Sequence, residues 1–192
     1  MSEVVKKPLK ITETGIAVYL DFHKEKTLAF RSDIDALEIE EQTGVSFKST
    51  HQGKMHACGH DGHMSILLGF LEYIMDNKEN LNDNIVFVFQ PAEEGVRGAA
   101  AIAQSGIIDD ADYFASSHIS FCANTGTVIA NPRNFLSTTK IDIRYKGKPA
   151  HAGAAPHLGR NALLAAAHTV TQLHGIARHG EGMTRINVGV LK

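Results

Sequence analysis

The segment Ile85–Phe89 constrains the fold more than any other stretch of the sequence. It reads IVFVF, a near-continuous run of β-branched and aromatic residues that follows a polar segment. Such a run is typical of a strand that is buried on both faces of a parallel sheet. We therefore predict an α/β fold in which this strand lies inside the sheet.

Other elements are predicted on either side of this strand. Two short strands, Ile16–Leu20 and Lys26–Phe30, flank the polar connection DFHKE and predict a hairpin or two neighbouring strands. After Asp61, apolar residues recur at the spacing of an amphipathic helix. These residues are Ile66, Leu67, Phe70, Leu71 and Ile74. A short alanine-rich helix is predicted over Arg97–Gly106, and a strand over Asp112–Ser116.

A second, smaller domain is predicted in the last third of the chain. The segment Asn131–Phe135 interrupts the β-rich region that precedes it. A strand at Thr138–Tyr145, a helix at Gly159–Ile176 and a strand at Arg185–Leu191 then form a β-α-β pattern. The predicted domains are residues 1–136 and residues 137–192.

Charge and apolar patterning restrict the partners. The 192 residues include 19 Lys and Arg against 21 Asp and Glu, and no long basic run is present that would bind a phosphate backbone. The sequence contains neither a signal-peptide pattern nor a run of eighteen apolar residues. We therefore expect a soluble, cytoplasmic protein that binds neither nucleic acid nor membranes.

A dense group of metal-binding residue types occurs in the segment MHACGHDGHM, which begins at Met55. His56, Cys58 and His60 recur at every second position, so an extended segment would place their side chains on one side. In a helix they would spread around the axis. The spacing therefore favours a strand end or loop from which two or three donors converge on a cation.

Asp61 and His63, which follow His60, each allow more than one interpretation. Asp61 is suited either to cap the following helix or to orient a ligand imidazole. His63 falls in the first helical turn, where a polar residue needs no special role. Two cysteines do not make a disulfide framework, so Cys58 is better explained as a thiolate ligand and Cys122 as a small buried residue.

Polar residues follow each predicted strand at its carboxyl end, where α/β folds usually assemble sites. Glu93 and Glu94 come just after the IVFVF strand, and adjacent side chains point apart. One carboxylate could bind metal while the other acts as a general base for water, although glutamate pairs are also common on surfaces. His118 follows the next strand as a further ligand or a core or surface residue. Asp33 follows an earlier strand, as a site residue or part of a solvated acidic loop.

The second domain contributes its own candidates in the segment GKPAHAGAAPHLGRNA. His151 is flanked by small residues that allow a ligand or a backbone segment to come close. Arg160 and Asn161 open the predicted helix, where an anionic group could rest. A solvated helix-start charge is the alternative for Arg160.

Four motifs, in order, resemble a known family. They are MHACGHDGHM, FQPAEEG, the strand-end SHI and GKPAHAGAAPHLGRNALLAA. The chain resembles, from Ala29 onward, the bimetallic amidohydrolases and aminoacylases that include hippurate hydrolases, N-acyl-amino-acid deacylases, auxin-conjugate hydrolases and aminobenzoyl-glutamate hydrolases. The segments HISFCANTG and HGIARHGEGMTRINVGVLK are most similar to the catalytic subunits of the aminobenzoyl-glutamate hydrolases.

The resemblance implies an architecture and a reaction. It implies a three-layer, zinc-peptidase-like catalytic domain, here incomplete, with the first part of a ferredoxin-like α+β lid that serves for dimerisation. It also implies two divalent metal ions, with manganese or zinc expected, and the hydrolysis of an amide bond in an N-acyl or N-aroyl amino acid such as aminobenzoyl-glutamate. A homodimer through the lid is expected.

The same resemblance implies roles for individual residues. The metal ligands would be Cys58, His60, Glu94 and His118. Glu93 would be the general base, and His151 would stabilise the oxyanion in the active site of a partner subunit. The groups that bind the substrate carboxylate would be Asn187, Arg160 and Asn161.

Two departures from the family pattern leave alternatives open. The wider clan has a His-x-Asp metal motif after its early strand, where this chain has Arg31-Ser32-Asp33. Family chains are also considerably longer, so we expect a fragment, or one part of a split enzyme, with an incomplete site. A non-catalytic metal-binding remnant is one alternative. Another makes Cys58 a nucleophile with His60 as its base, but this leaves the glutamate pair unexplained.

Overall fold

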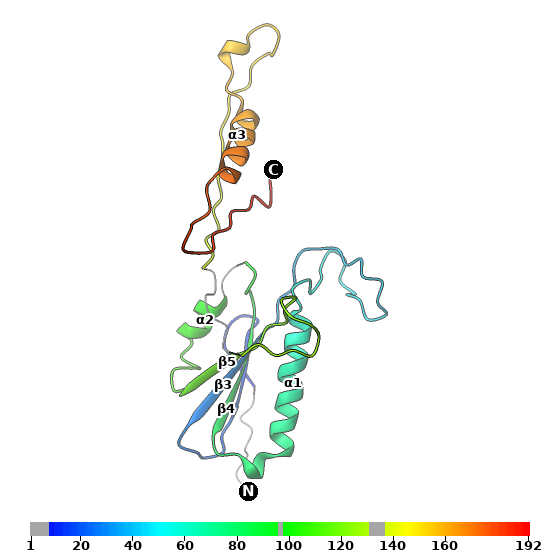
Figure 1. Ribbon diagram of the computed structural model, residues 1–192, viewed down its shortest axis with the longest axis vertical. Coiled ribbons are helices and arrows are strands. Elements are labelled where there is room, and N and C mark those ends of the chain that lie inside the picture. Colours follow the sequence, from blue (N-terminus) through cyan, green and yellow to red (C-terminus); the bar gives the residue numbers. More distant parts are fainter. Residues whose placement is uncertain (1–7, 96–97, 131–136) are drawn as a thin grey trace. The chain divides into compact units, whose positions relative to one another are not determined.

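The computed structural model describes residues 8–95, 98–130 and 137–192. The chain divides into two compact units, Met1–Gly126 and Thr127–Lys192 (Figure 1). The interrupting segment Asn131–Phe135 and the predicted boundary beside residue 136 lie outside the described residues. Each unit is described by itself below.

The first unit is built on a mixed five-stranded sheet in the order β1-β2-β4-β3-β5. Its strands are β1 (Leu9–Lys10), β2 (Ile16–Leu20), β3 (Thr27–Asp33), β4 (Asn84–Gln90) and β5 (Tyr113–Ser116). Strands β3, β4 and β5 run parallel, whereas β2 pairs antiparallel with β4 and β1 antiparallel with β2. Helices pack on both faces, so the predicted α/β class is confirmed (Figure 1).

Strand β4 is buried on both faces, as the IVFVF run predicts, because its side chains alternate between two hydrophobic cores. On one face Ile85 and Phe87 pack with Leu20 and with residues of helix α1 (His60–Asp76). On the other face Val86 and Val88 pack with Ala29 and with Ile102 of helix α2 (Gly98–Gln104). The position of β4 inside the sheet therefore places one helix on each side.

The prediction that β2 and β3 form a hairpin or neighbouring strands is wrong, because β4 lies between them. The connection from β2 to β3 passes the amino-terminal end of β4. There the side chain of Asn84, the first residue of β4, binds the backbone of the connection. Asn84 Oδ1 accepts the N–H groups of Phe22 (2.9 Å) and Lys24 (3.1 Å), and Nδ2 donates to the Lys24 carbonyl (2.8 Å). These contacts join residues far apart in the sequence, so local patterning does not reveal them.

Helix α1 begins at His60, one residue before the predicted start, and a short 3₁₀ turn (Lys78–Asn80) follows it. Its N-cap is Gly59 and not Asp61, because the chain enters the helix through a left-handed conformation (φ 81°) that favours glycine. Ile66 was predicted on the buried face but is 53% exposed, since it lies one position away from the buried Leu67. In α2, the predicted first residue Arg97 lies outside the described part.

The second unit contains a 3₁₀ turn (Pro156–Leu158) and helix α3 (Ala162–His174), which falls within the predicted helix. The strands predicted at Thr138–Tyr145 and Arg185–Leu191 are not present in the described residues of this unit. Almost all residues of both segments are exposed, and the only bridge between described residues here pairs Lys148 with Arg160. A strand needs a neighbour for its backbone groups, and neither segment has one in the described part.

None of the helices in the described part of the chain is both long enough and apolar enough to span a membrane.

Candidate metal centre

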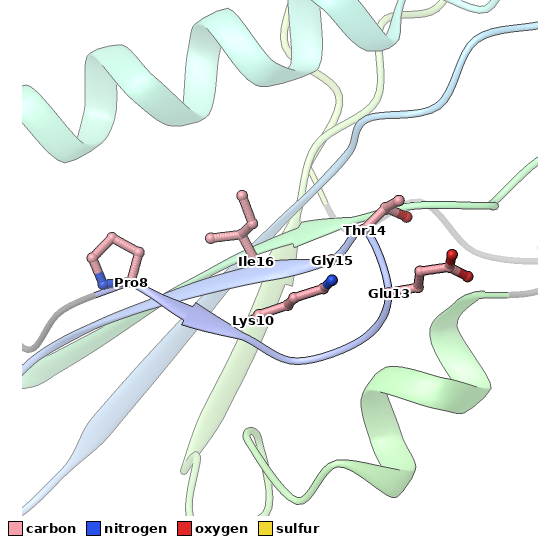
Figure 2. A pocket seen from close by; sticks show the side chains of 6 residues that line it. All are labelled: Pro8, Lys10, Glu13, Thr14, Gly15 and Ile16. Carbon is pink, nitrogen blue, oxygen red and sulfur yellow. The ribbon is translucent and has the colours of Figure 1, made fainter.

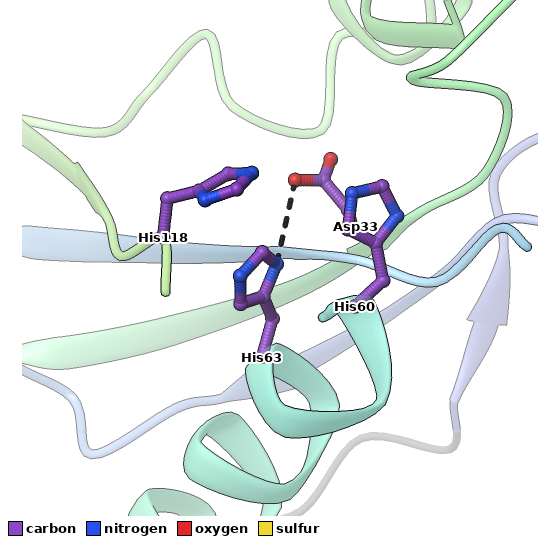
Figure 3. A group of neighbouring side chains, drawn as sticks. All are labelled: Asp33, His60, His63 and His118. Atoms are coloured by element: carbon purple, nitrogen blue, oxygen red, sulfur yellow. Dashed lines mark ion pairs between the residues drawn. The ribbon is translucent and has the colours of Figure 1, made fainter. Parts of the chain in front are cut away.

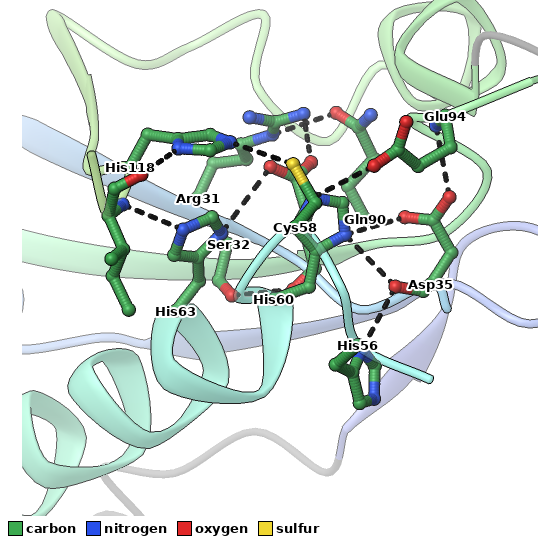
Figure 4. Close-up of polar contacts among 12 residues, drawn as sticks. Arg31, Ser32, Asp35, His56, Cys58, His60, His63, Gln90, Glu94 and His118 are labelled. Carbon is green, nitrogen blue, oxygen red and sulfur yellow. Dashed lines mark hydrogen bonds and ion pairs between the residues drawn. The ribbon is translucent and has the colours of Figure 1, made fainter. Parts of the chain in front are cut away.

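The carboxyl ends of the three parallel strands deliver the polar residues of the candidate site. Strand β3 ends at Asp33, β4 at Gln90 and β5 at Ser116, all toward the same edge of the sheet. The segments that follow bring Asp35, Glu94 and His118 to the first turn of α1 (Figure 4). This convergence at strand ends is what α/β topology provides.

Cys58, His60 and Glu94 come together here, with one ligand atom of each lying within 4.8 Å of the others. His118 joins them, since its Nε2 lies 3.6 Å from Cys58 Sγ. Cys58 lies in the turn before α1 and His60 is the first residue of that helix, so the donors lie at a turn and a helix start. The structure thus gathers the four residues predicted as ligands, although the role itself stays a prediction.

The orientation of His60 suits a metal ligand. Its Nδ1 lies 3.0 Å from the Asp35 carbonyl oxygen and 3.2 Å from Asp35 Oδ1, so this nitrogen carries a proton and donates. The lone pair of Nε2 then points toward Glu94 Oε1, 3.9 Å away. This buried nitrogen has no hydrogen-bond partner among the residues that the structure describes. A cation beside His60 Nε2 would supply the partner that this nitrogen lacks among the described residues.

Asp35 holds this arrangement in place. Its Oδ2 accepts the N–H of Glu94 (3.0 Å), while its backbone oxygen also faces Nδ1 of His56 (3.1 Å). Burial opposes ionisation of Asp35, but hydrogen bonds from the backbone N–H groups of Glu94 and Glu93 hold its pKa below the usual value. The Asp35 carboxylate therefore orients His60 and the glutamate turn, while His56 contacts the backbone oxygen of Asp35.

Cys58 is unsuited to act as a nucleophile in this setting. Burial, a hydrogen bond with the Glu94 carboxylate and the negative charges of Glu94 and Glu93 raise the pKa of its thiol to about 11. Reactive cysteines have a lowered pKa in an electropositive environment, which is the opposite case. A cation at this place would invert the local charge and stabilise the thiolate as a ligand.

His63, for which the sequence leaves open a supporting role in the site or that of a polar residue at the helix start, is only 1% exposed and lies against Asp33 and His118 (Figure 3). Its Nε2 accepts the N–H of Ile119 (2.8 Å), and its Nδ1 lies 3.8 Å from Asp33 Oδ2. The three-residue spacing from His60, which places both on one helix face, was the available signal.

Asp33 is buried and is therefore not part of a solvated acidic loop. Arg31 forms an ion pair with Asp33 Oδ1, and Arg31 Nε donates to Gln90 Oε1 (2.9 Å) (Figure 4). Burial raises the pKa of Asp33, and the Arg31 guanidinium opposes this shift. The Arg31-Ser32-Asp33 segment thus contacts the site through Asp33, which lies beside His63 and is paired with Arg31.

Asp33, His60, His63 and His118 also form a group that could hold a metal ion by distance alone. A backbone N–H can only donate, so His63 Nε2 must be the unprotonated nitrogen. Burial, followed by the neighbouring His118 and His60, lowers the pKa of His63 to about 4, so the ring is neutral and Nδ1 carries the proton. His63 has no lone pair left for a cation in this arrangement.

Glu93 is exposed in the turn after β4, beside Glu94, where its backbone N–H binds Asp35 and its negative charge acts on Cys58. Cys122 is exposed, so its prediction as a small buried residue is wrong. A separate hollow of about 270 Å³ in this unit is lined by Pro8, Lys10, Glu13, Thr14, Gly15 and Ile16 (Figure 2).

Four predicted site residues, His151, Arg160, Asn161 and Asn187, belong to the second unit. His151 Nδ1 accepts the N–H groups of Gly153 (3.2 Å) and Ala154 (3.0 Å), so its Nε2 carries the proton. Asn161 Oδ1 accepts the N–H of Leu164 (2.9 Å) and caps α3. A hollow of about 580 Å³ is lined in part by Arg160 and Asn161, while Asn187 is exposed.

The sequence matches the model of Peptidase family M20/M25/M40 over residues 29–186. A homolog of one p-aminobenzoyl-glutamate hydrolase subunit, from Haemophilus influenzae, is 72% identical over 187 residues, covering 93% of this chain and 44% of the relative. The corresponding p-aminobenzoyl-glutamate hydrolase subunit of Escherichia coli and the indole-3-acetyl-aspartic acid hydrolase of Enterobacter agglomerans are each 46% identical over 93% of this chain and 43% of their own length. The chain therefore spans less than half the length of these relatives.

Solved structures give the same picture. An aminobenzoyl-glutamate utilization protein from Klebsiella pneumoniae is 42% identical with a TM-score of 0.70, covering 92% of this chain and 40% of that protein. A Bacillus subtilis protein described as a dinuclear metal-binding peptidase of the M20 family is 32% identical with a TM-score of 0.56, covering 60% of this chain and 33% of that protein.

Proposed function

The chain belongs to Peptidase family M20/M25/M40, and from this we propose that it carries the metal-binding half of an amidohydrolase for N-acyl or N-aroyl amino acids. Aminobenzoyl-glutamate is the substrate that the names of the similar proteins suggest. One observation carries the proposal: Cys58, His60 and Glu94 converge, with the buried His60 Nε2 left for a cation. A cluster of this kind has little value to the fold without an ion, because buried polar groups need partners.

We assign the cation ligands to Cys58, His60, Glu94 and His118, whose donor types suit two divalent ions such as manganese or zinc. Bound divalent cations would supply Lewis-acid polarisation of the amide carbonyl and a lowered pKa for the attacking water. Asp35 keeps His60 in the tautomer in which Nε2 is unprotonated, and it also binds the backbone N–H of Glu94. The ligands are thereby held before an ion arrives.

Proton transfer is assigned to Glu93, the exposed neighbour of Glu94 in the same turn. It would take a proton from the attacking water and return it to the leaving amine when the amide C–N bond breaks. A carboxylate beside, but not among, the ligands has the freedom that this step needs. The proposal separates the two glutamates by role: Glu94 binds the ion and Glu93 carries the proton.

We assign two roles to the second unit. It would recognise the substrate, and it would stabilise the negative charge that develops on the carbonyl oxygen. His151 Nε2 carries a proton, because Nδ1 accepts two backbone N–H groups, and it can therefore donate to that oxygen. We propose that it does so in a partner subunit of a homodimer, with this unit forming the first part of a ferredoxin-like lid. Arg160, Asn187 and the Nδ2 group of Asn161 are assigned to the substrate carboxylate.

The test is hydrolysis of aminobenzoyl-glutamate and a panel of N-acyl amino acids by the chain loaded with manganese or zinc. Glu93→Gln should lower kcat by about 10²–10⁴-fold, the usual contribution of a general base, with unchanged metal content. Glu94→Gln should lower metal content, measured by elemental analysis, as well as kcat. Glu93 and Glu94 are adjacent and chemically identical, so each variant is the matched control for the other.

Three results would contradict parts of this proposal. Undiminished hydrolysis by Glu93→Gln would remove the general-base role. Absence of bound metal after supplementation would remove the ligand set. Bound metal without hydrolysis of any panel member would favour the alternative of a non-catalytic metal-binding chain.

A further inference from the structure

We propose that His63 is a positioning residue that fixes the place of His118 by binding the backbone N–H of Ile119. This inference rests on the proposed role of His118 as a metal ligand. His63 itself does not bind the cation in this assignment. Its task is to hold the segment after β5 so that Nε2 of His118 faces Cys58 Sγ, 3.6 Å away.

The backbone of Ile119 is bound on both sides by imidazoles. Its N–H donates to His63 Nε2 (2.8 Å), and its carbonyl oxygen accepts from His118 Nδ1 (2.6 Å). With Nδ1 of His118 donating, the lone pair of its Nε2 is left for a ligand role. A single residue thus links the buried His63 to the exposed His118, whose rings lie 4.3 Å apart between centroids.

The tautomer of His63 is set from the opposite side. Its Nδ1 faces Asp33 Oδ2 at 3.8 Å, and the Asp33 carboxylate is in turn paired with Arg31 (Figures 3 and 4). A carboxylate beside Nδ1 favours the proton on that nitrogen, so Nε2 is left to accept from Ile119. The proton on His63 Nδ1 therefore leaves Nε2 as the acceptor that holds the backbone of Ile119.

The side chain of Ile119 supplies a second contact with the start of α1. A Cβ atom on Gly62 would lie 2.3 Å from Ile119 Cδ1, and one on Gly59 would lie 3.6 Å from it. Ile119 therefore lies over the glycines of the first turn, from which His63 also projects. Since His118 and its neighbours are exposed, these contacts with α1 are what keep the segment beside the other ligands.

The experiment compares His63→Gln with His63→Asn in the full chain. A Gln amide reaches the position of the imidazole Nε2 and can accept the Ile119 N–H, whereas Asn ends near Nδ1 and cannot. Amide hydrogen exchange of the metal-free chain, followed by NMR, reports whether the Ile119 N–H is hydrogen-bonded. We expect this N–H to stay protected in the wild type and in His63→Gln, and to lose protection in His63→Asn.

The binding constants for Zn²⁺ and Mn²⁺ form the second readout. His63→Asn should weaken binding by about 10–100-fold, which is typical when a group that orients a ligand is removed, and His63→Gln should recover most of it. Equal loss in both variants would overturn the proposal, because it would make His63 a ligand or a packing residue. Unchanged protection of the Ile119 N–H in His63→Asn would overturn it as well.

Thermal unfolding of each variant checks that it folds. If His63→Asn does not fold, His63→Gln still provides the test: we expect protection of the Ile119 N–H and metal binding close to those of the wild type, and loss of either would overturn the proposal. Failure of the proposed function is a separate result, because amide exchange is measured without metal and without substrate.

Discussion

Each imidazole in the site has one nitrogen committed to a hydrogen bond, and this decides its role. His60 and His118 both donate from Nδ1, to Asp35 and to the Ile119 carbonyl, so their Nε2 lone pairs remain for a cation. His63 accepts at Nε2 and is therefore excluded as a ligand. Histidines that look equivalent in the sequence thus differ because of the partner of one ring nitrogen.

The ion pair between Arg31 and Asp33 leads to a prediction about stability. Asp33 is 1% exposed, so Arg31→Leu would leave its carboxylate buried without a charged partner. We expect a loss of about 3–5 kcal/mol in the free energy of unfolding at pH 7, as for other broken buried pairs. Urea unfolding followed by circular dichroism measures this loss.

The loss should depend on pH in a defined direction. Burial raises the pKa of Asp33 in the folded state, so its stabilising contribution is complete below the ordinary carboxyl pKa and is lost as the pH rises through the folded pKa. Without Arg31 the folded pKa rises further, and the difference between wild type and Arg31→Leu should grow from pH 3 to pH 7. Adding Asp33→Asn to Arg31→Leu should remove this pH dependence, and a constant difference in the single variant would contradict the prediction.

At the level of elements, β4 organises the first unit because both of its faces are buried. Phe87 is fully buried on one face, where its ring lies 6.2 Å from that of Phe30 and 5.8 Å from that of Phe70 between centroids. Strand β5 lies at the edge of the sheet and is exposed along its length. A phenylalanine in β4 should therefore contribute more to the free energy of unfolding than a phenylalanine in β5.

This contrast gives a matched pair of substitutions. Phe87→Ala should lower the free energy of unfolding by about 3–5 kcal/mol, because it removes a large buried side chain and leaves a cavity. Phe114→Ala in β5, where the side chain is 52% exposed, should change it by about 0.5 kcal/mol or less. Chemical denaturation of both variants provides the comparison. Similar losses for the two would show that β5 is covered in solution.

At the level of the whole molecule, the two units carry different parts of the proposed chemistry. The candidate ligands all lie in the first unit, whereas His151 and the residues assigned to the substrate carboxylate lie in the second. Binding of the cations should therefore depend only on the first unit. Hydrolysis should require both.

His151→Ala tests this division of labour in the intact chain. We expect the same metal content per chain as in the wild type, because its imidazole is not among the ligands, together with a loss of hydrolysis. Cys58→Ser is the control, since it should lower metal content by replacing a thiolate with a weaker hydroxyl donor. Elemental analysis after dialysis measures both. Loss of metal in His151→Ala would show that the second unit contributes a ligand.

Local patterning predicted much of this molecule, and its failures share one cause. The IVFVF run, the helix after Asp61 and the polar residues at strand ends are properties of short segments, so periodicity and residue type reveal them. Two predictions were wrong, because strand pairing depends on partners that are distant in the sequence. These were the hairpin between β2 and β3 and the two strands of the second unit. Asn84 binds the β2–β3 connection from about sixty residues away, which no local pattern shows.

The sequence by itself determined the α/β class, the family and the residues gathered as candidate ligands, because motif order and residue chemistry are written along the chain. Only the tertiary structure decided which nitrogen of each histidine is available. It placed His63 against Asp33 and Ile119, and it buried Asp33 and paired it with Arg31. These choices depend on hydrogen-bond partners that meet through folding, so the sequence order of the residues does not contain them.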